Sequence, residues 1–411
     1  MATKVRSEAM ILAIVGAVQF INILDFMIVM PLGPDFAVAL DIPKHEIPSI
    51  GAAYTAAGGI AGLLGSQFLD RFDRRKALVA CMFGLFAGTW LATFATGLHS
   101  LMAARVIAGM FGGPASSLAM SIVSDVVPAE RRGRAMGAVM GMFAAASVLG
   151  VPLALELSES FGWQSPFYVV ALLGLSIALM VIATMPPMTG HLEGRGPASK
   201  RIMAFDLLRD PTVLVSYAAT LVLMASNFAI VPILSTYLQF NLGYPRKHLS
   251  ILYFFGGMFS FVGMRLVGRQ VDRHGAAKVA AAVTGVLAVI IFAWFVRYSP
   301  AIPVIVLFVG YMLTTSIRGV AYQTVTSKVP SMRDRAGYTS LQSAMSHIAA
   351  ALGAWGSSLV IVERGDGKLD GMDTLGLCAI GGAAMVPLVL WLLERRLKRR
   401  DGASGGGIPI A

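Results

Sequence analysis

Charged residues are scarce in this chain of 411 amino acids. Asp, Glu, Lys and Arg make up 13% of the residues, roughly half the share found in an ordinary soluble domain. Apolar residues make up 56%, and the mean hydropathy is +0.72. A water-soluble core does not need this much apolar sequence, so the composition excludes an ordinary soluble protein and favours one that crosses a membrane several times.

Cysteine and histidine are also rare, with two and six residues respectively. Cys81 and Cys378 lie inside apolar runs, so we expect no disulfide framework. The histidines are scattered, and the sequence lacks the Gly-x4-Gly-Lys-Ser/Thr loop that holds nucleotide phosphates. We therefore expect no enzyme activity, no metal, no cofactor and no ATP-driven pump, which leaves an ion gradient as the energy source.

The net charge of +11 comes from short basic clusters between apolar runs. No basic domain studded with aromatic residues is present, so we expect membrane lipid rather than nucleic acid as a partner. With the N-terminus in the cytoplasm, 24 of the 33 Lys and Arg residues fall on the cytoplasmic side and 6 outside. The positive-inside rule therefore predicts that both termini are cytoplasmic.

Twelve apolar runs divide the chain into two sets of six. They start near Met10, Ile47, Ala77, Leu101, Ala135, Phe167, Val213, Ile251, Val279, Ile302, Tyr338 and Leu375. The sequence predicts an all-α membrane protein with a six-helix bundle in residues 1–185 and another in residues 211–396. We predict that the polar segment 186–210 is a cytoplasmic linker and that the basic, Gly-rich segment 397–411 is a disordered tail.

The two predicted bundles share motifs at a fixed spacing. The pairs that lie 202 residues apart are Asp70-Arg71 with Asp272-Arg273, Pro128 with Pro330, and Asp25 with Asn227. Three matches at one offset predict a duplicated, pseudo-symmetric protein. Transporters built in this way bind their substrate between the repeats, near the middle of the bilayer.

Several loops and helices resemble those of the major facilitator superfamily, and the resemblance covers the whole chain. The loop Asp70-Arg71-x-x-Arg74-Arg75 is similar to the family's signature loop, and RVIAGMFGGPASS to its fourth-helix motif. Gly150 and Pro152 stand in a sequence similar to the fifth-helix motif of exporters, although Val151 separates them. The pattern looks most like that of bacterial drug and sugar efflux permeases. It implies a monomeric carrier of small molecules in the bacterial inner membrane.

The resemblance also implies a cytoplasmic gate. In the family the signature loop closes the cytoplasmic side, so Asp70 would face the start of the eleventh span near Gly337, and Asp272 would face the fifth span near Gly133. Asp125 is the expected partner of the loop arginines. The predicted gate residues are Asp70, Arg71, Arg74, Asp125, Asp272 and Arg273. Alternatively, these charges only anchor loops and set the topology.

Asp25 and Arg105 are predicted partners inside the first bundle. A charge near the bilayer centre costs about 3 kcal/mol or more unless it is neutralised. Asp25 lies 16 residues past Ala9 on an outgoing helix, and Arg105 lies 20 residues before Asp125 on an incoming one, so their depths agree within about one turn. If Arg105 moved away, Asp25 would take up a proton. The pair is therefore predicted to couple transport to protons, or else to be a permanent salt bridge.

The predicted tenth span carries another cation, Arg318. In the family the first, fourth, seventh and tenth helices line the central cavity, which implies that Arg318 contacts the substrate. A cationic residue there favours an anionic or zwitterionic substrate. The alternative is that its side chain reaches the cytoplasmic headgroups. The full set of predicted cavity residues is Arg318, Asn22, Asn227, Tyr322, Gln323 and His347.

We therefore predict a proton-coupled antiporter that exports a small amphipathic molecule by alternating access. Import or uncoupled passage of a small organic anion is the alternative, because Arg105 and Arg318 fit such a substrate and the exporter motif is imperfect.

Overall fold

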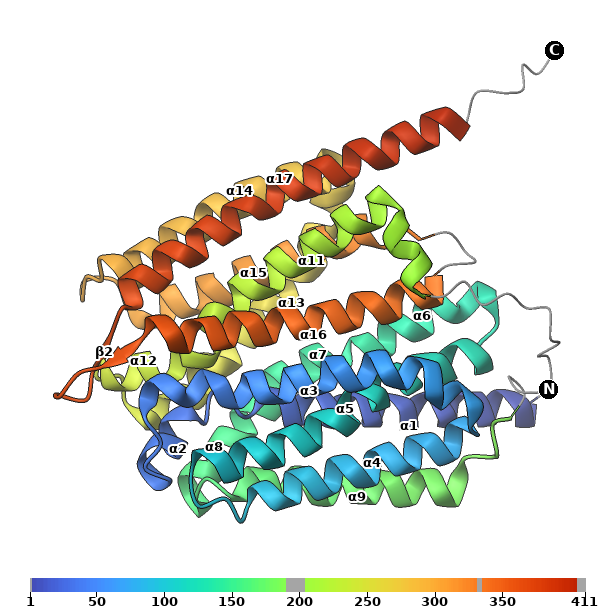
Figure 1. Cartoon of the computed structure of the whole chain (residues 1–411), viewed down its shortest axis with the longest axis horizontal. Coiled ribbons are helices and arrows are strands. Elements are labelled where there is room, and N and C mark those ends of the chain that lie inside the picture. The colour runs from blue at the N-terminus through green and yellow to red at the C-terminus, as the bar shows by residue number, and fades with distance from the viewer. Residues whose placement is uncertain (1, 190–203, 331–334, 405–411) are drawn as a thin grey trace.

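The computed structural model describes residues 2–189, 204–330 and 335–404, and most of them are helical (Figure 1). The helices of the first half are α1 (Ala2–Met27), α2 (Gly33–Ala39), α3 (Ile47–Phe68), α4 (Arg74–Ala92), α5 (Leu98–Val126), α6 (Ala129–Met140), α7 (Met142–Ala145), α8 (Val151–Phe161) and α9 (Ser165–Thr184). Those of the second half are α11 (Pro211–Ile230), α12 (Leu234–Phe240), α13 (Leu249–His274), α14 (Ala276–Ile291), α15 (Val304–Thr326), α16 (Arg335–Val360) and α17 (Met372–Ser404).

Eleven helical segments among the described residues are long and apolar enough to cross a membrane. The helix α16 has 26 residues but is more polar than these, because Thr339, Gln342, Ser346 and His347 interrupt its apolar sequence. It packs along α3 of the first half and α11 of the second, so protein rather than lipid covers much of it (Figure 1). The chain is thus a nearly all-helical membrane protein.

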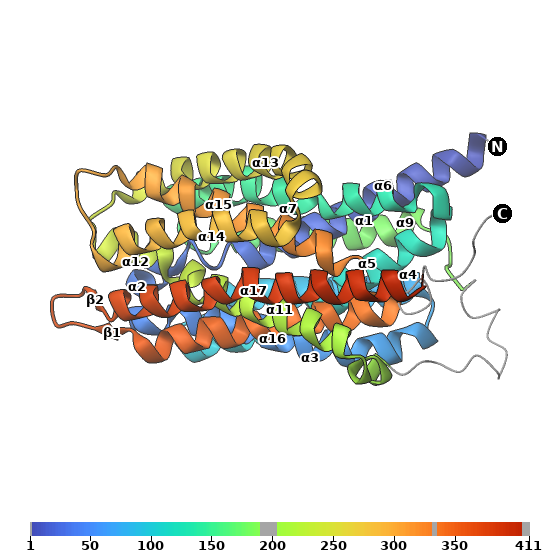
Figure 2. The same cartoon turned by 90° about the horizontal axis from the view of Figure 1, so that it is seen from above.

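The first residues of α1 and the last residues of α17 lie at the same end of the bundle, which we call the terminal end (Figures 1 and 2). The opposite, distal end carries α2, α12 and a hairpin of two short strands, β1 (Val362–Glu363) and β2 (Leu369–Asp370). The two halves meet where α3 packs on α16 and where α8 packs on α13.

The predicted boundaries of the linker and the tail can be compared with the helices. The predicted linker, 186–210, falls between α9 and α11, and its residues 190–203 lie outside the described part. The tail differs from the prediction, since α17 continues as a helix to Ser404 instead of ending near residue 396. Leucine, lysine and arginine are good helix formers. Arg400 also donates hydrogen bonds to the carbonyls of Lys328 and Val329, at 3.0 and 2.9 Å.

Glycines of α5 allow its backbone to touch that of α3. A Cβ atom added at Gly113 would lie 2.2 Å from the carbonyl oxygen of Gly58, and one added at Gly109 would lie 2.3 Å from that of Tyr54. Small residues at a helix interface let two backbones approach this closely in a membrane. The contact fixes the distance between α3 and α5, and with it the position of Arg105 inside the first half.

Replacing Gly113 by Ala should therefore destabilise the protein. The added methyl group forces α3 and α5 apart, and overpacking of this kind costs about 1–3 kcal/mol. The melting temperature of the purified protein in detergent measures the effect. Gly285→Ala is the matched control, because a Cβ atom there meets nothing within 4 Å and alanine favours the helix. Equal melting temperatures for Gly113→Ala and the natural protein would contradict the close approach.

Candidate functional site

A fully buried ion pair joins α1 to α5 near the distal end of the first half. Arg105 Nη1 donates to Asp25 Oδ1 at 3.0 Å, and Nη2 donates to Oδ2 at 2.7 Å. Nη2 also donates to the main-chain oxygen of Asp25 at 3.0 Å. Both side chains are 0% exposed. The structure thus brings together the two residues whose depths matched in the sequence, in the two-pronged geometry that strengthens an arginine–carboxylate contact.

Neighbouring helices complete the surroundings of this pair. The Thr89 hydroxyl of α4 donates to Asp25 Oδ1 at 2.7 Å. The guanidinium of Arg105 lies 4.7 Å from the ring centre of Tyr54 and 5.8 Å from that of Phe167, so aromatic faces also stabilise its charge. The pair is enclosed by α3, α4 and α9. The helices α4 and α9 lie on the side of the bundle away from the second half (Figure 1).

A hydrogen-bonded chain extends from this site. Tyr54 donates to the Asn22 side-chain oxygen at 3.1 Å, and the Asn22 amide donates to the carbonyl of Gly112 at 2.8 Å. Asn22, predicted to face a substrate, therefore bonds to α3 and α5 in this conformation. Sequence reasoning missed Thr89 and Tyr54 as partners of the ion pair, because neither carries a charge that needs neutralising.

The second half lacks this ion pair. At the repeat offset of 202 residues, Asn227 stands in place of Asp25 and Leu307 in place of Arg105. Neither the acid nor the base is present at these positions, as expected for groups that are costly to bury singly.

Arg318 of α15 is buried, with 1% of its surface exposed. A side chain that extended to the headgroups would not be enclosed by protein in this way, so the geometry disagrees with that alternative. The Tyr322 hydroxyl shares a hydrogen bond with Thr220 at 2.6 Å and accepts one from Gln342 at 2.6 Å. These contacts tie α15 to α11 and α16.

The other predicted cavity residues are spread over the second half. His347 lies on α16 against α3, where a Cβ atom added at Gly58 would be 3.6 Å from its Nδ1. Asn227 is partly buried, and Gln323 is exposed. The structure therefore places His347 at the junction of the halves and does not group Gln323 with Arg318.

At the terminal end, the signature loop forms one of the expected contacts. Arg74, at the start of α4, makes an ion pair through Nε with Asp125 at the end of α5. Arg71, Asp272 and Arg273 are exposed, and the side chain of Asp70 lies outside the described part. The loop thus joins helices of one half, while the expected contacts of Asp70 and Asp272 with the other half are not among the described ones.

Asp73, inside the signature loop, has a role that sequence reasoning missed. Its Oδ1 accepts from the main-chain NH groups of Arg75 at 2.9 Å and Met188 at 3.0 Å. The carboxylate therefore caps the start of α4 and holds the chain that leaves α9.

Ion pairs at the distal end connect the two halves, and the sequence did not reveal them. Arg246, just before α13, donates through Nε to Asp35 Oδ1 at 2.8 Å and through Nη2 to Oδ2 at 2.7 Å. Ser158 donates to the same carboxylate at 2.8 Å, and Glu159 lies 4.0 Å from Arg246. We call Asp35 and Arg246 the distal latch. Its members lie 211 residues apart, in segments that carry no repeat motif.

A second distal contact joins Lys44 of the first half to Glu363 of β1. Partial burial raises the pKa of Glu363, but the hydrogen bonds and charge of Lys44 outweigh burial and hold that pKa below its ordinary value. Because the pKa of Glu363 in the folded protein is lower than its ordinary value of 4.5, the contact contributes its full stability at any pH above 4.5. That contribution is lost only as the pH falls through the lowered value, so the contact persists at neutral pH.

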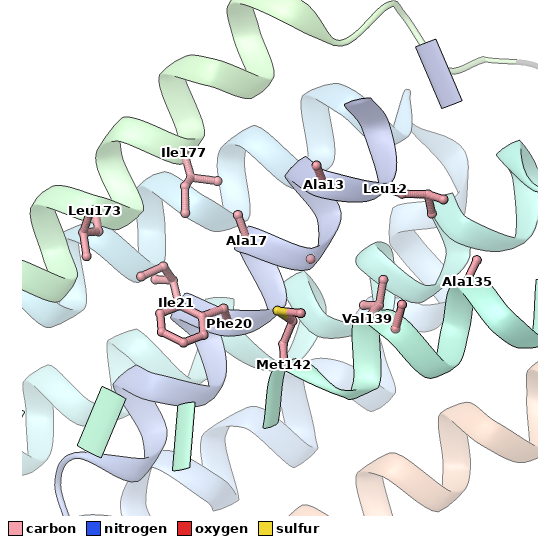
Figure 3. A pocket seen from close by; sticks show the side chains of 12 residues that line it. Leu12, Ala13, Ala17, Phe20, Ile21, Ala135, Val139, Met142, Leu173 and Ile177 are labelled. Carbon is pink, nitrogen blue, oxygen red and sulfur yellow. The ribbon is translucent and has the colours of Figure 1, made fainter. Parts of the chain in front are cut away.

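A hollow of about 630 Å³ lies elsewhere in the first half, among α1, α6, α7 and α9 (Figure 3). Its wall is apolar, and it includes Phe20, Val139, Met142 and Leu173. A polar ligand needs a few placed polar groups to orient it. This hollow has none, so it does not compete with the charged sites as the place where a polar molecule binds.

Comparison with known proteins places these features in a family. The family model described as Major Facilitator Superfamily matches residues 15–354. A chloramphenicol resistance protein of Streptomyces lividans is 25% identical over 253 residues, 61% of this chain and 64% of that protein, so the match spans less than two thirds of its length. The purine ribonucleoside efflux pump NepI of Escherichia coli K12 is 23% identical over 343 residues, 83% of each chain.

Solved structures agree in fold. A bacterial homologue of the human lysosomal transporter Spinster, solved inward-facing and occupied, superposes with a TM-score of 0.74 at 15% identity, over 93% of this chain and 96% of that one. The nucleoside transporter NupG gives a TM-score of 0.70 at 15% identity, over 93% and 98%. The helices, the signature loop and the family match lead to one conclusion: the chain belongs to the Major Facilitator Superfamily.

Proposed function

We propose that this protein is a secondary active transporter that exports a small amphipathic molecule in exchange for protons. The observation that carries the proposal is the two-pronged, fully buried contact of Asp25 with Arg105. The protein is then a monomer in the bacterial inner membrane, with twelve spans in two pseudo-symmetric bundles and both termini in the cytoplasm. The count of twelve includes α16, which would span the membrane between α3 and α11 (Figure 1).

The ion pair suits proton coupling because neither charge can be left alone. Separating the partners in a low-dielectric interior is costly, and binding a proton to Asp25 removes the carboxylate charge. Protonation would therefore free Arg105, which Tyr54 and Phe167 continue to stabilise through their ring faces. A conformational change that moves α5 against α1 would then be linked to proton uptake, and its reversal to proton release.

Export is the favoured direction. The chloramphenicol resistance protein and the purine ribonucleoside efflux pump are both named for removing or resisting a compound, and they support efflux here. The clustering of Lys and Arg at the terminal end supports a cytoplasmic location for that end. An uncoupled facilitator is the alternative if Asp25 and Arg105 never separate.

Alternating access would use contacts at both ends. With the terminal end in the cytoplasm, the distal latch and the Lys44–Glu363 contact close the outer side. This conformation would then be the one that accepts substrate from the cytoplasm. Opening to the outside requires these inter-half contacts to break, and new contacts to form at the terminal end. The residues proposed for that closure are Asp70, Arg71, Arg74, Asp125, Asp272 and Arg273.

Replacing Asp25 by Asn should abolish substrate-linked proton movement, since an amide cannot exchange the proton. Proteoliposomes containing a pH-sensitive dye and supplied with chloramphenicol or salicylate measure this, alongside uptake of the labelled compounds. Asp366→Asn makes the same chemical change in an exposed loop and should leave coupling intact.

A second variant separates an effect on proton coupling from an effect on folding. Asp25→Asn leaves Arg105 without its charged partner, so a second variant, Asp25→Asn with Arg105→Gln, removes both charges. If the double variant moves protons with substrate as the natural protein does, the pair is only structural and the proposal is wrong. Transport of either compound without proton movement in the natural protein would identify a facilitator instead.

Breaking the distal latch should slow transport. Asp35→Arg places two cations together and should lower the efflux rate severalfold, because charge pairs that are partly buried are costly to break. The double exchange of Asp35→Arg with Arg246→Asp restores opposite charges and should recover part of the rate. Arg364→Gln is the control, since Arg364 pairs with Asp370 inside the hairpin of one half. Equal rates for all variants would exclude a gating role for the latch.

A further inference from the structure

The guanidinium of Arg318 has no acceptor among the described residues. Its Nε and Nη2 atoms are buried and make no hydrogen bond, and no described carboxylate pairs with it. A buried cation without a partner is unstable by several kcal/mol in a low-dielectric interior. Arg105, the other fully buried arginine in the described spans, shows how the same protein neutralises such a charge.

Further unsatisfied donors lie close to Arg318. Tyr311 stands seven residues earlier on α15, two helical turns away on the same face, and interacts electrostatically with Arg318. Its hydroxyl is buried and has no hydrogen-bond partner in the described chain. The ring of Trp294 lies 6.2 Å from that of Tyr311, and its Nε1 is also buried without a partner. Tyr322, on the same face, is satisfied by Thr220 and Gln342.

No acid among the described residues pairs with Arg318. Asp25 is the fully buried carboxylate of the described spans, and Arg105 and Thr89 occupy both of its oxygens. It faces α4 and α5, whereas α15 belongs to the second half on the other side of the bundle (Figure 1). At the corresponding position of the second half, Asn227 is neutral. Within the part of the chain that the structure describes, the charge of Arg318 is therefore left for a group from outside the chain to balance.

We propose that Arg318 and Tyr311 form an oxyanion subsite that binds a carboxylate-type group of the transported molecule. The inference rests on the proposed transport function and adds the substrate class, an organic anion or zwitterion. A guanidinium presents parallel N–H donors that match the two oxygens of a carboxylate, and the Tyr311 hydroxyl supplies a further donor. The substrate's anionic group is then held in the second half, while the proton is handled in the first.

The subsite predicts selectivity between molecules that differ only in charge. Thermal stability of the purified protein in detergent, with increasing ligand, gives the apparent affinity of each compound. The probes are four matched pairs: benzoate and benzamide, salicylate and salicylamide, cinnamate and cinnamamide, and nicotinate and nicotinamide. We expect at least one carboxylate to bind about tenfold more tightly than its amide, because hydrogen bonds to a charged partner are the stronger ones.

Variants test whether Arg318 causes the selectivity. Arg318→Gln should remove the preference for the carboxylate, Arg318→Lys should keep part of it, and Tyr311→Phe should weaken carboxylate binding about threefold. Arg265→Gln is the control, because Arg265 is an exposed cation on α13 that lies over the ring of Phe261. Arg318→Lys retains the charge, so it keeps the test valid if the glutamine variant does not fold.

Three outcomes would overturn the subsite. The first is that the natural protein distinguishes no pair, the second is that Arg318→Gln keeps the preference, and the third is that chloride or inorganic phosphate alone stabilises the protein through Arg318 as well as the carboxylates do. The last result would identify an inorganic anion site instead. Asp25→Asn should still bind the carboxylate, so loss of proton coupling in that variant and loss of charge selectivity at Arg318 test the two proposals separately.

Discussion

A charge enclosed in the membrane must be balanced, and this constraint organises the interior of the protein. In this conformation Arg105 and Arg318 expose 0% and 1% of their surfaces, so bulk water does not fully solvate either charge. The first half balances Arg105 with Asp25, whose carboxylate also accepts a hydrogen bond from the Thr89 hydroxyl. The second half offers Arg318 no acid among the described residues. The same physical demand is therefore met inside the chain in one half and is left for a ligand in the other.

Close helix packing decides which charged groups can meet. The bare backbones at Gly109 and Gly113 let α5 lie against α3, which brings Tyr54 over the guanidinium of Arg105. A wider separation would let lipid or water reach the pair and would weaken the contact between its charges. The small residues therefore support the ion pair, because they set the helix spacing that keeps it enclosed.

Sequence reasoning predicted the features that depend on local pattern or on depth. The apolar runs predicted most of the helices, and matching depths predicted the contact of Asp25 with Arg105. The distal latch was missed because Asp35 and Arg246 lie outside the apolar runs, in segments whose geometry depends on the packing of whole helices. We missed the helical continuation of α17 because we gave the basic, Gly-rich composition of the tail more weight than the helix-forming residues before Ser404.

The difference between the halves gives the strongest argument for a division of labour. At the predicted repeat offset of 202 residues, Asn227 and Leu307 stand where the first half has the acid and the base, and Arg318 stands where the first half has Ser116. Without an acid at the position of Asn227, the second half leaves its buried cation available to select a ligand, as proposed. The proposed proton site and anion site lie on opposite halves, so they would interact only through the motion of one half against the other. That separation would let a proton and an anionic substrate be exchanged without the two meeting.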